Sequence, residues 1–388
     1  MRILVAAERL GHAGGMERYL DVVLPALVAR GAIVHVLARE AAAAPDGVTV
    51  EHVDWAEEHD APDADARAQT VRAMNDFAPD AAVAHNVMDA GVVEALRAAP
   101  RFAYHVHDHR PFCPNGDRVF PRSGRICTRP LGFPCAVHAL LDGCAYGARP
   151  RTLVLIRRRE RLRDAIAAAD AVVVASAYMG ARAYASGVPA ERLVTVPLPL
   201  PDDAYAATVA PSQPGTVVFA GRVVPQKGLA SLVSAVALLV PERRPVVHAL
   251  GDGPALAGAR ADAARLGVAV DAPGAVAAPD VRAAIDGAAL VVLPSQWAEP
   301  FGYVGIEAFA RGRTVVAFDT GGVRAWLADR KNGLAVPAGD TAALSAAIDA
   351  LLTDDERRDQ FGRRAREDAE RYRVERVADA LLSAYRPV

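Results

Sequence analysis

The sequence lacks several features that would indicate a broad functional class. Its 44 Lys and Arg nearly balance its 46 Asp and Glu, for a formal net charge of −2, so nothing indicates nucleic-acid binding. No apolar run approaches the roughly 18 residues of a transmembrane helix. The chain turns acidic at Glu8, too soon for a signal peptide, which predicts a cytoplasmic protein. With 388 residues, it is long enough for two domains.

Cysteine is scarce as well, and every cysteine falls within one irregular stretch that also contains several Gly and Pro residues. The four cysteines are Cys113, Cys127, Cys135 and Cys144. They are too few for a disulfide-built scaffold, and their spacing lacks the close pairs of common zinc sites. Free thiols, a structural zinc and disulfides therefore all stay open, and the stretch predicts an insertion over residues 108–150.

A dinucleotide-binding G-x-G-x-x-G motif is absent, but the hydrophobic pattern predicts a doubly wound α/β fold. Residues 2–7 are an expected strand, and a glycine-containing loop leads into a helix with Leu20, Val23 and Leu24 on one face. The chain then returns to an expected strand. Buried strands are expected at residues 33–37, 81–85, 102–107, 171–176, 216–220, 246–250, 289–293 and 314–318.

The stretch at residues 294–307 carries the clearest chemical pattern. It follows a short apolar strand and contains Glu299 in a loop and Glu307 in the helix after it. Gly302 falls near the first helical turn, where a ligand can approach the backbone and free N–H groups favour phosphate. Ligands in such sheets bind beyond the carboxyl ends of the strands. Two acids flanking a phosphate-binding turn suit a nucleotide sugar, which has a hydroxylated group at each end of a diphosphate.

Two cations follow the strand expected at residues 216–220. Arg222 and Lys227 lie in the loop that comes directly after it. Both are expected to be exposed, and two cations at a strand's carboxyl end suit a diphosphate.

These two stretches resemble the motifs of a large family of retaining glycosyltransferases, family 4, also called glycosyl transferases group 1. Glu-Pro-Phe-Gly at Glu299, followed by Glu307, resembles the family's E-x7-E motif. Gly-Arg at Arg222, followed by Lys227, resembles its phosphate-binding pair. The resemblance implies the GT-B fold, in which two Rossmann-like α/β domains face a central cleft.

The same resemblance implies the domain limits. An acceptor-side domain is expected at residues 1–197 and a nucleotide-sugar domain at residues 205–370. The last residues, 371–388, are expected to form a helix that packs back on the first domain.

The resemblance also implies roles for individual residues. Glu307 is expected to hold the ribose hydroxyls and Glu299 the hydroxyls of the sugar. Arg222, Lys227 and the turn at Phe301 and Gly302 are expected to neutralise the diphosphate. Other expected donor-binding residues are Gly15, Gly251, Gly274, Val276 and Tyr303. The expected acceptor-side residues are Gly14, Glu17 and Asp108.

His107 is the residue expected to reach the donor sugar, because the His-Asp pair at a strand end is similar to a family position with that role. With Glu299, Arg222 and Lys227, it completes the expected catalytic set. His105, His107 and His109 are not expected to form a metal site, since His105 and His109 are placed on one face of the strand and His107 on the other. No metal is expected to take part in the chemistry.

The resemblance predicts transfer of a sugar from a UDP- or GDP-linked donor to a hydroxyl group of a small-molecule, glycan or lipid-linked acceptor. Retention of the anomeric configuration by a front-face reaction is expected, within glycan, polysaccharide, glycolipid or natural-product biosynthesis. One alternative is a nucleotide-sugar 2-epimerase of the same fold. Another is a non-catalytic module that binds a sugar nucleotide or, through the cysteine loop, a metal.

Two charged patterns have ordinary structural interpretations. Five arginines between Arg157 and Arg163 predict a solvated helix face, although peripheral contact with the inner face of a membrane is the alternative. The pair Asp63 and Asp65 resembles a metal-binding D-x-D motif, but acids are common where a helix starts, which is the interpretation preferred here.

Overall fold

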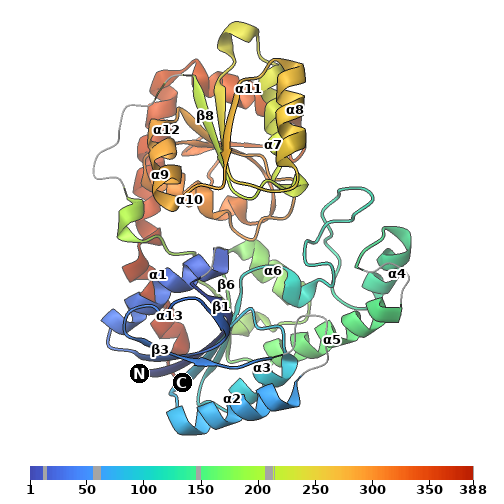
Figure 1. Ribbon diagram of the computed structural model, residues 1–388, viewed down its shortest axis with the longest axis vertical. Helices are drawn as coiled ribbons and strands as arrows, with labels where there is room; N and C mark the ends of the chain where they lie inside the picture. Colours follow the sequence, from blue (N-terminus) through green and yellow to red (C-terminus); the bar gives the residue numbers. More distant parts are fainter. Residues whose placement is uncertain (12–14, 56–62, 146–149, 206–212, 214, 388) are drawn as a thin grey trace. The chain divides into compact units, whose positions relative to one another are not determined.

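The computed structural model describes residues 1–11, 15–55, 63–145, 150–205, 213 and 215–387. The chain divides into two compact units, each with its own parallel sheet (Figure 1). The first unit combines Met1–Pro199 with Val374–Val388, and the second comprises Leu200–Arg373. The C-terminal helix therefore belongs to the first unit.

The first unit is built on a seven-stranded sheet with the order β3-β2-β1-β4-β5-β6-β7, all neighbours parallel. The strands are β1 (Arg2–Leu10), β2 (Ile33–Ala41), β3 (Val48–His52), β4 (Ala81–His85), β5 (Phe102–Val106), β6 (Ala171–Val174) and β7 (Leu193–Thr195). This strand order is that of a Rossmann sheet, and its strands read as short apolar runs because both faces are covered.

Helices cover the two faces of this sheet as separate hydrophobic layers. They are α1 (Gly15–Ala29), α2 (Ala64–Phe77), α3 (Ala90–Leu96), α5 (Pro150–Ala167), α6 (Ala177–Ala185) and α13 (Val374–Tyr385). A further helix, α4 (Phe133–Leu141), packs on α5 instead. Figure 1 shows α1 and α13 on one side of the sheet and α2, α3 and α5 on the other, which matches the two cores of this unit.

The second unit has a six-stranded parallel sheet with the order β10-β9-β8-β11-β12-β13. The strands are β8 (Thr216–Ala220), β9 (Val246–Leu250), β10 (Val270–Gly274), β11 (Leu290–Leu293), β12 (Val315–Phe318) and β13 (Gly333–Val336). The helices are α7 (Leu229–Ala237), α8 (Leu256–Leu266), α9 (Ala278–Gly287), α10 (Tyr303–Ala310), α11 (Thr341–Leu352) and α12 (Asp355–Ala369).

The α/β fold with two Rossmann-like domains is confirmed, and every expected strand is present at nearly its predicted position. Some boundaries differ from the predictions. The first strand continues to Leu10 rather than ending at residue 7, and Gly274 closes β10 rather than lying in a free turn. Asp63 caps α2 by accepting hydrogen bonds from the backbone of Asp65 and Ala66, so the helix-start interpretation of the D-x-D pair is confirmed.

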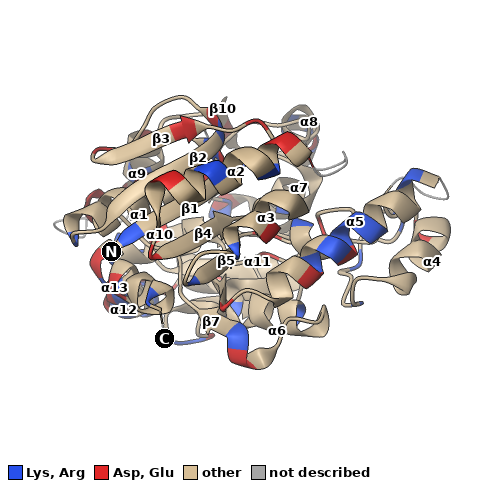
Figure 2. Cartoon of the chain, turned by 90° about the horizontal axis from the view of Figure 1, so that it is seen from below, with Lys and Arg blue, Asp and Glu red and all other residues tan. Residues whose placement is uncertain are grey.

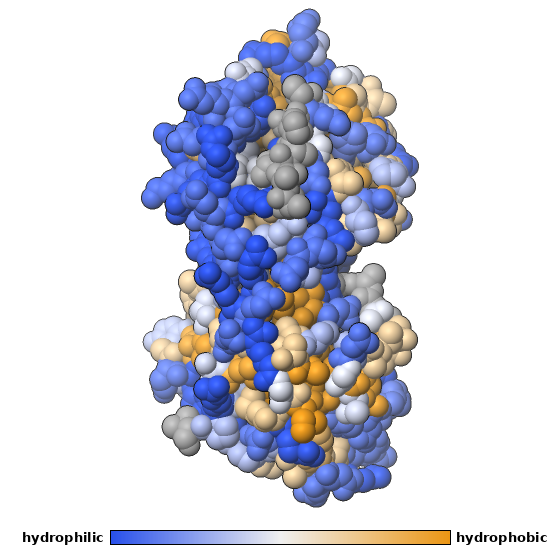
Figure 3. All heavy atoms as spheres, turned by 90° about the vertical axis from the view of Figure 1, so that its left-hand side faces the viewer, coloured by the Kyte–Doolittle hydropathy of each residue, from blue (hydrophilic) through white to orange (hydrophobic). Residues whose placement is uncertain are grey.

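The two units differ in the character of their surfaces. On the face shown in Figure 3, the unit that contains β8 is mostly hydrophilic, whereas hydrophobic residues gather on the unit that contains β1. Across the part of the chain that the structure describes, none of the helices has both the length and the hydropathy needed to cross a bilayer.

Helix α10 packs so closely on Trp326 that its Gly305 has no room for a side chain. A Cβ at this position would lie 2.3 Å from the indole ring, which is fully buried and donates a hydrogen bond to the carbonyl oxygen of Phe301 at 2.6 Å. The ring therefore fixes both α10 and the turn that precedes it.

Replacing Gly305 with Ala should lower the free energy of unfolding by about 1–3 kcal/mol, because the added methyl group displaces a packed ring. Gly258 is the matched control, since it lies in α8 with nothing near its missing Cβ. Gly258→Ala should raise the free energy of unfolding by up to about 1 kcal/mol through helix propensity. Urea denaturation followed by circular dichroism measures both, and equal effects of the two substitutions would contradict the packing argument.

Candidate active site

The centre of the second unit's candidate site is an ion pair between Lys227 and Glu299. The Nζ atom of Lys227 lies 2.6 Å from Oε1 of Glu299, and the Ser295 hydroxyl donates a hydrogen bond of 2.5 Å to the same oxygen. Burial alone would raise the pKa of this carboxyl group, but the charge of Lys227 and hydrogen bonds from Lys227, Ser295 and Trp297 together lower it below its ordinary value. Glu299 is therefore a carboxylate although only 4% of it is exposed.

The pair forms because two loops meet at one edge of the sheet. The strands β8 and β11 are parallel neighbours, so the loops after them emerge side by side. Gln296 donates its backbone N–H to the carbonyl oxygen of Gln226 at 2.8 Å. At Gly228, which has a φ of 76°, a Cβ would lie 1.9 Å from the carbonyl oxygen of Pro294. Glycine is therefore required for the loops to approach closely enough to join Lys227 to Glu299.

A third loop holds the backbone of Glu299 from another side. Gly322 donates its N–H to the carbonyl oxygen of Glu299 at 2.6 Å, and a Cβ on Gly321 would lie 2.2 Å from that oxygen. The Thr320 hydroxyl donates to the carbonyl oxygen of Ser295 at 3.2 Å. The position of Glu299 is thus set by the loops after β8, β11 and β12.

The two cations differ in their surroundings. Arg222 is exposed, as expected. Lys227 is not: the expectation of a freely exposed lysine is wrong, since only 22% of its side chain is exposed and its charge is paired with Glu299. The Lys227 ammonium group also lies 5.1 Å from the centre of the Trp297 ring. Sequence analysis found both partners but treated them as separate ligand-binding groups.

In the turn between Glu299 and Glu307, backbone groups rather than side chains are the candidates for binding a ligand. Phe301 is buried, and its ring packs edge-on against Tyr372 at 5.9 Å. Gly302 has a φ of 95°, which favours glycine, and α10 begins at Tyr303 rather than at Phe301 as predicted. Glu307 is buried within α10, at the end of the expected motif.

Glycines bring the ends of three neighbouring strands into close contact. Gly251, which follows β9, donates its N–H to the carbonyl oxygen of Gly274 at 2.8 Å. A Cβ on Gly251 would lie 1.9 Å from the carbonyl oxygen of Gly221. Of the expected donor-binding positions, Gly251 and Gly274 are thus brought together, with half-buried Val276 just beyond them. Gly221 was recognised as part of the motif but not as a member of this group.

In the first unit, His107 belongs to a cluster of three histidines. The ring nitrogens His85 Nδ1 and His107 Nε2 lie 2.9 Å apart, and His105 Nε2 lies 2.6 Å from the Tyr385 hydroxyl of α13. The ring of Tyr19 packs against all three imidazoles. Burial lowers the pKa of His107 to about 4 and holds the pKa values of His85 and His105 well below the ordinary range. All three rings are therefore neutral at neutral pH.

The prediction that His105 and His107 face opposite sides was wrong. Residues two apart share one face of an extended segment, and the two rings lie 5.8 Å apart. Within the described residues, possible metal-ligating atoms of His85, His105 and His107 all lie within 4.8 Å of one another. Sequence analysis missed His85, although its place at the end of a predicted strand was the available signal.

Asp108 is held by a charged network at the same strand end. Arg110 lies 2.8 Å from Asp108 and 3.3 Å from Glu8, which follows the buried part of β1. Burial would raise the pKa of Asp108, but Arg110 and a hydrogen bond from Asn86 lower it overall. Asp108 is therefore a carboxylate with fixed orientation. Sequence analysis did not identify Arg110 as its partner.

The remaining expected residues lie at the start of α1. Gly15 opens the helix with nothing near its missing Cβ, and Glu17 is buried in the first turn. Gly14 lies outside the described residues.

Comparisons with known proteins cover both units. Residues 14–199 match the Glycosyl transferase 4-like domain, and residues 203–368 match Glycosyl transferases group 1. A D-inositol 3-phosphate glycosyltransferase of Segniliparus rotundus is 38% identical over 177 residues, which are 44% of this chain and 39% of that protein. An alpha-maltose-1-phosphate synthase of Mycolicibacterium smegmatis is 31% identical over 263 residues, 58% of this chain and 65% of that protein. The chain thus matches less than two thirds of the length of either relative.

The solved structure of Anabaena Alr3699/HepE in complex with UDP has a similar fold, with a TM-score of 0.73 and 19% identity over 99% of both chains. The chain therefore has the GT-B fold, and its two halves carry the two domain types of a glycosyltransferase of this architecture.

Replacing Lys227 with Met should lower the free energy of unfolding by about 1–3 kcal/mol at neutral pH, because Glu299 would stay buried without its counter-charge. Since folding lowers the pKa of Glu299, its stabilising effect is present above the ordinary carboxyl pKa and is lost as the pH falls through the lowered value. The difference from wild type should thus be full at neutral pH and smaller at about pH 3, below the ordinary carboxyl pKa of about 4.

Urea titrations at both pH values, followed by tryptophan fluorescence, measure this difference. The exposed Lys331, the other lysine of the chain, provides the matched control Lys331→Met, which should leave stability unchanged at both pH values. A loss for Lys227→Met that does not change with pH would contradict the ion-pair explanation.

Proposed function

We propose that this protein is a glycosyltransferase that moves a sugar from a nucleoside diphosphate sugar, UDP- or GDP-linked, to an acceptor hydroxyl group. The observation that carries the proposal is the pair of buried Glu299 and half-buried Lys227 at the carboxyl edge of a Rossmann-like sheet. The names of relatives support glycosyl transfer, and the UDP and UDP-glucose complexes of Anabaena Alr3699/HepE support a nucleotide-sugar donor.

The second unit's groups suit the leaving diphosphate and the donor's hydroxyls. Arg222 and Lys227 supply positive charge where negative charge develops on the diphosphate, without requiring a metal for this step. Lys227 and Ser295 engage Oε1 of Glu299 and fix its position, and this carboxylate is assigned to the sugar hydroxyls. Glu307 is assigned to the ribose hydroxyls.

In the first unit, His107 is assigned to a donor-sugar hydroxyl. Because its Nε2 atom faces His85, its Nδ1 atom is the ring nitrogen left for a ligand. The lowered pKa keeps this imidazole neutral, so it can donate or accept a hydrogen bond according to its tautomer. Asp108 is assigned to the acceptor side, with Arg110 fixing its orientation.

We assign retention to a front-face reaction. A double displacement needs a carboxylate nucleophile beside the anomeric carbon. Glu299 is engaged by Lys227 and Ser295, and Asp108 by Arg110, so each carboxylate has a binding or positioning role. In the front-face reaction, the bond from the anomeric carbon to the diphosphate oxygen breaks as the acceptor oxygen bonds from the same side. The diphosphate takes the acceptor proton.

Transfer assays with a panel of UDP and GDP sugars and hydroxylated acceptors test the proposal. Lys227→Ala should lower kcat/KM by on the order of a hundredfold, because it removes charge that stabilises the transition state. Lys331→Ala should keep wild-type kinetics. Near-normal turnover by Lys227→Ala would contradict the assignment, and an isobaric donor formed without acceptor would identify an epimerase instead.

Proton NMR of the first-formed product belongs to the same experiment. An α-linked donor should give an α-linked product, and no sugar should be trapped on Glu299 or Asp108. A β-linked product would overturn retention, whereas a trapped glycosyl-enzyme would overturn only the front-face step.

We also propose that the first unit contacts an anionic membrane surface through α4 and the start of α5. The arginine run of α5, seen as blue bands in Figure 2, is solvated in part, as predicted, but Arg159 is buried and Arg161 forms a two-bond ion pair with Glu94. Arg157 remains exposed, and five apolar side chains of these helices are exposed too. They are Phe133, Leu140, Leu141, Leu153 and Val154.

The spacing of Phe133, Leu140 and Leu141 puts them on one face of α4, with an aromatic anchor at its start. Phe133→Ser combined with Leu141→Ser should weaken binding to anionic vesicles at least tenfold, since each removes buried apolar area worth about 1.5 kcal/mol or more. Co-sedimentation measures the affinity, and Leu238→Ser in the second unit is the control. Binding that persists in the double variant would refute this surface.

A further inference from the structure

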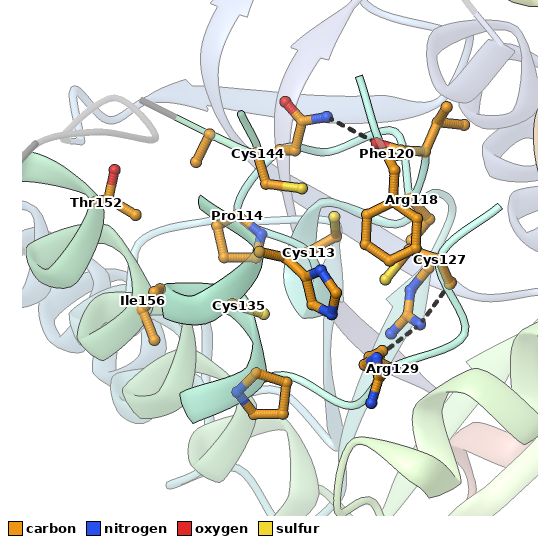
Figure 4. Close-up of a pocket in the computed structure, with 15 residues that line it drawn as sticks. Cys113, Pro114, Arg118, Phe120, Cys127, Arg129, Cys135, Cys144, Thr152 and Ile156 are labelled. Atoms are coloured by element: carbon orange, nitrogen blue, oxygen red, sulfur yellow. Dashed lines mark hydrogen bonds between the residues drawn. The ribbon is translucent and has the colours of Figure 1, made fainter. Parts of the chain in front are cut away.

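The insertion between β5 and α5 gathers every cysteine of the chain around one pocket (Figure 4). Cys113 follows the short helix after β5, and Cys127 follows the strand-like pair Val119 and Ile126. Cys135 lies in α4, and Cys144 lies just beyond the end of that helix. Four cysteines that are separated along the sequence thus line the same space.

The thiols are not joined to one another, and all four are half-buried. Figure 4 shows the four cysteine side chains around the same pocket. His138 of α4 lines the pocket as well, and its Nδ1 atom lies 2.6 Å from Oδ2 of Asp142.

Few hydrophobic side chains in the described part of this insertion are buried. Residues 121–125 are exposed, and the buried core nearby comes down to Phe112, Leu131 and Ala139. The buried Arg118 ties the loop by hydrogen bonds to the carbonyl oxygen of Arg129 and to the Ser186 hydroxyl. A cross-link would add to the small buried area of this irregular segment in offsetting the conformational entropy lost on ordering it.

We propose that Cys113, Cys127, Cys135 and Cys144 bind one structural zinc ion. Four thiolates form a closed tetrahedral set, the usual arrangement for zinc that stabilises a loop rather than reacting with a substrate. Binding releases a proton from each cysteine that is a thiol, because the ligand is the thiolate. His138, held by Asp142, lies beside this set.

The histidine cluster is the tighter group of possible ligands, but one ring nitrogen of each histidine already has a partner. His85 and His107 face each other at 2.9 Å, and Tyr385 engages Nε2 of His105. Thiols, by contrast, form only weak hydrogen bonds and bind zinc strongly as thiolates. The cysteine sulfurs do not form an equally compact group among the described residues, so zinc binding would draw the segments of the insertion together.

Elemental analysis of the full-length protein, purified in the reduced state without chelator, tests the site. We expect about one zinc ion per chain. Because the chain has four cysteines in total, thiol titration reports on this site alone. All four should react slowly until a chelator removes zinc and rapidly afterwards. Protein with no zinc that takes up none on dialysis, protein with disulfides, or protein with iron would each overturn the assignment.

Variants separate the ligands from their neighbours. Cys127→Ser should lower the zinc content by at least tenfold, whereas Phe133→Ser, an exposed change in the same insertion, should retain it. His138→Ala should also retain zinc, and loss of zinc there would replace the four-cysteine set with one that includes His138. If Cys127→Ser fails to fold, limited proteolysis of the wild-type protein decides: chelation should expose the insertion to cleavage, and added zinc should restore protection.

Discussion

The second unit depends on holding two opposite charges together where two strands end. An unpaired carboxylate at the position of Glu299 would be costly, and Lys227 offsets that cost only because the two loops approach closely. That approach requires Gly228 against Pro294 and Gly321 against Glu299. The ion pair therefore depends on these two glycines, since a side chain at either position would separate the charges. A diphosphate would meet a lysine whose position is already set.

The first unit fixes its candidate groups differently, through burial of neutral rings. Tyr385 reaches His105 from α13, so the last helix of the chain takes part in organising the histidine cluster. Tyr19 of α1 packs against the same rings, and burial keeps them uncharged. A neutral network of this kind orients His107 without placing another charge beside Asp108. Both units therefore present paired charges, and the first unit adds a cluster of neutral imidazoles.

The sequence was sufficient for the strands and for the identity of most polar groups, because buried parallel strands have a strong hydrophobic signature. The sequence did not show which residues become neighbours through the order of the strands in the sheet. Lys227 and Glu299 are 72 positions apart, and only the strand order makes them neighbours. His85 was missed for the same reason, since β4 and β5 had to be known as adjacent. The burial of Arg159 could not be predicted either, because a dense run of charged residues does not show which side chain is buried.

The insertion combines two features, a cluster of cysteines and a set of exposed apolar side chains, and both involve one short helix. Helix α4 directs Cys135 into the pocket and exposes Phe133 and Leu141 elsewhere on its surface. A short helix with so little buried area cannot be stabilised by packing alone, and exposed apolar residues do not add to its stability in water. A cross-link through the cysteines would supply the missing constraint on one side and leave the apolar face free on the other. The metal and the membrane proposals are therefore physically linked: the first would give α4 the rigidity that the second requires.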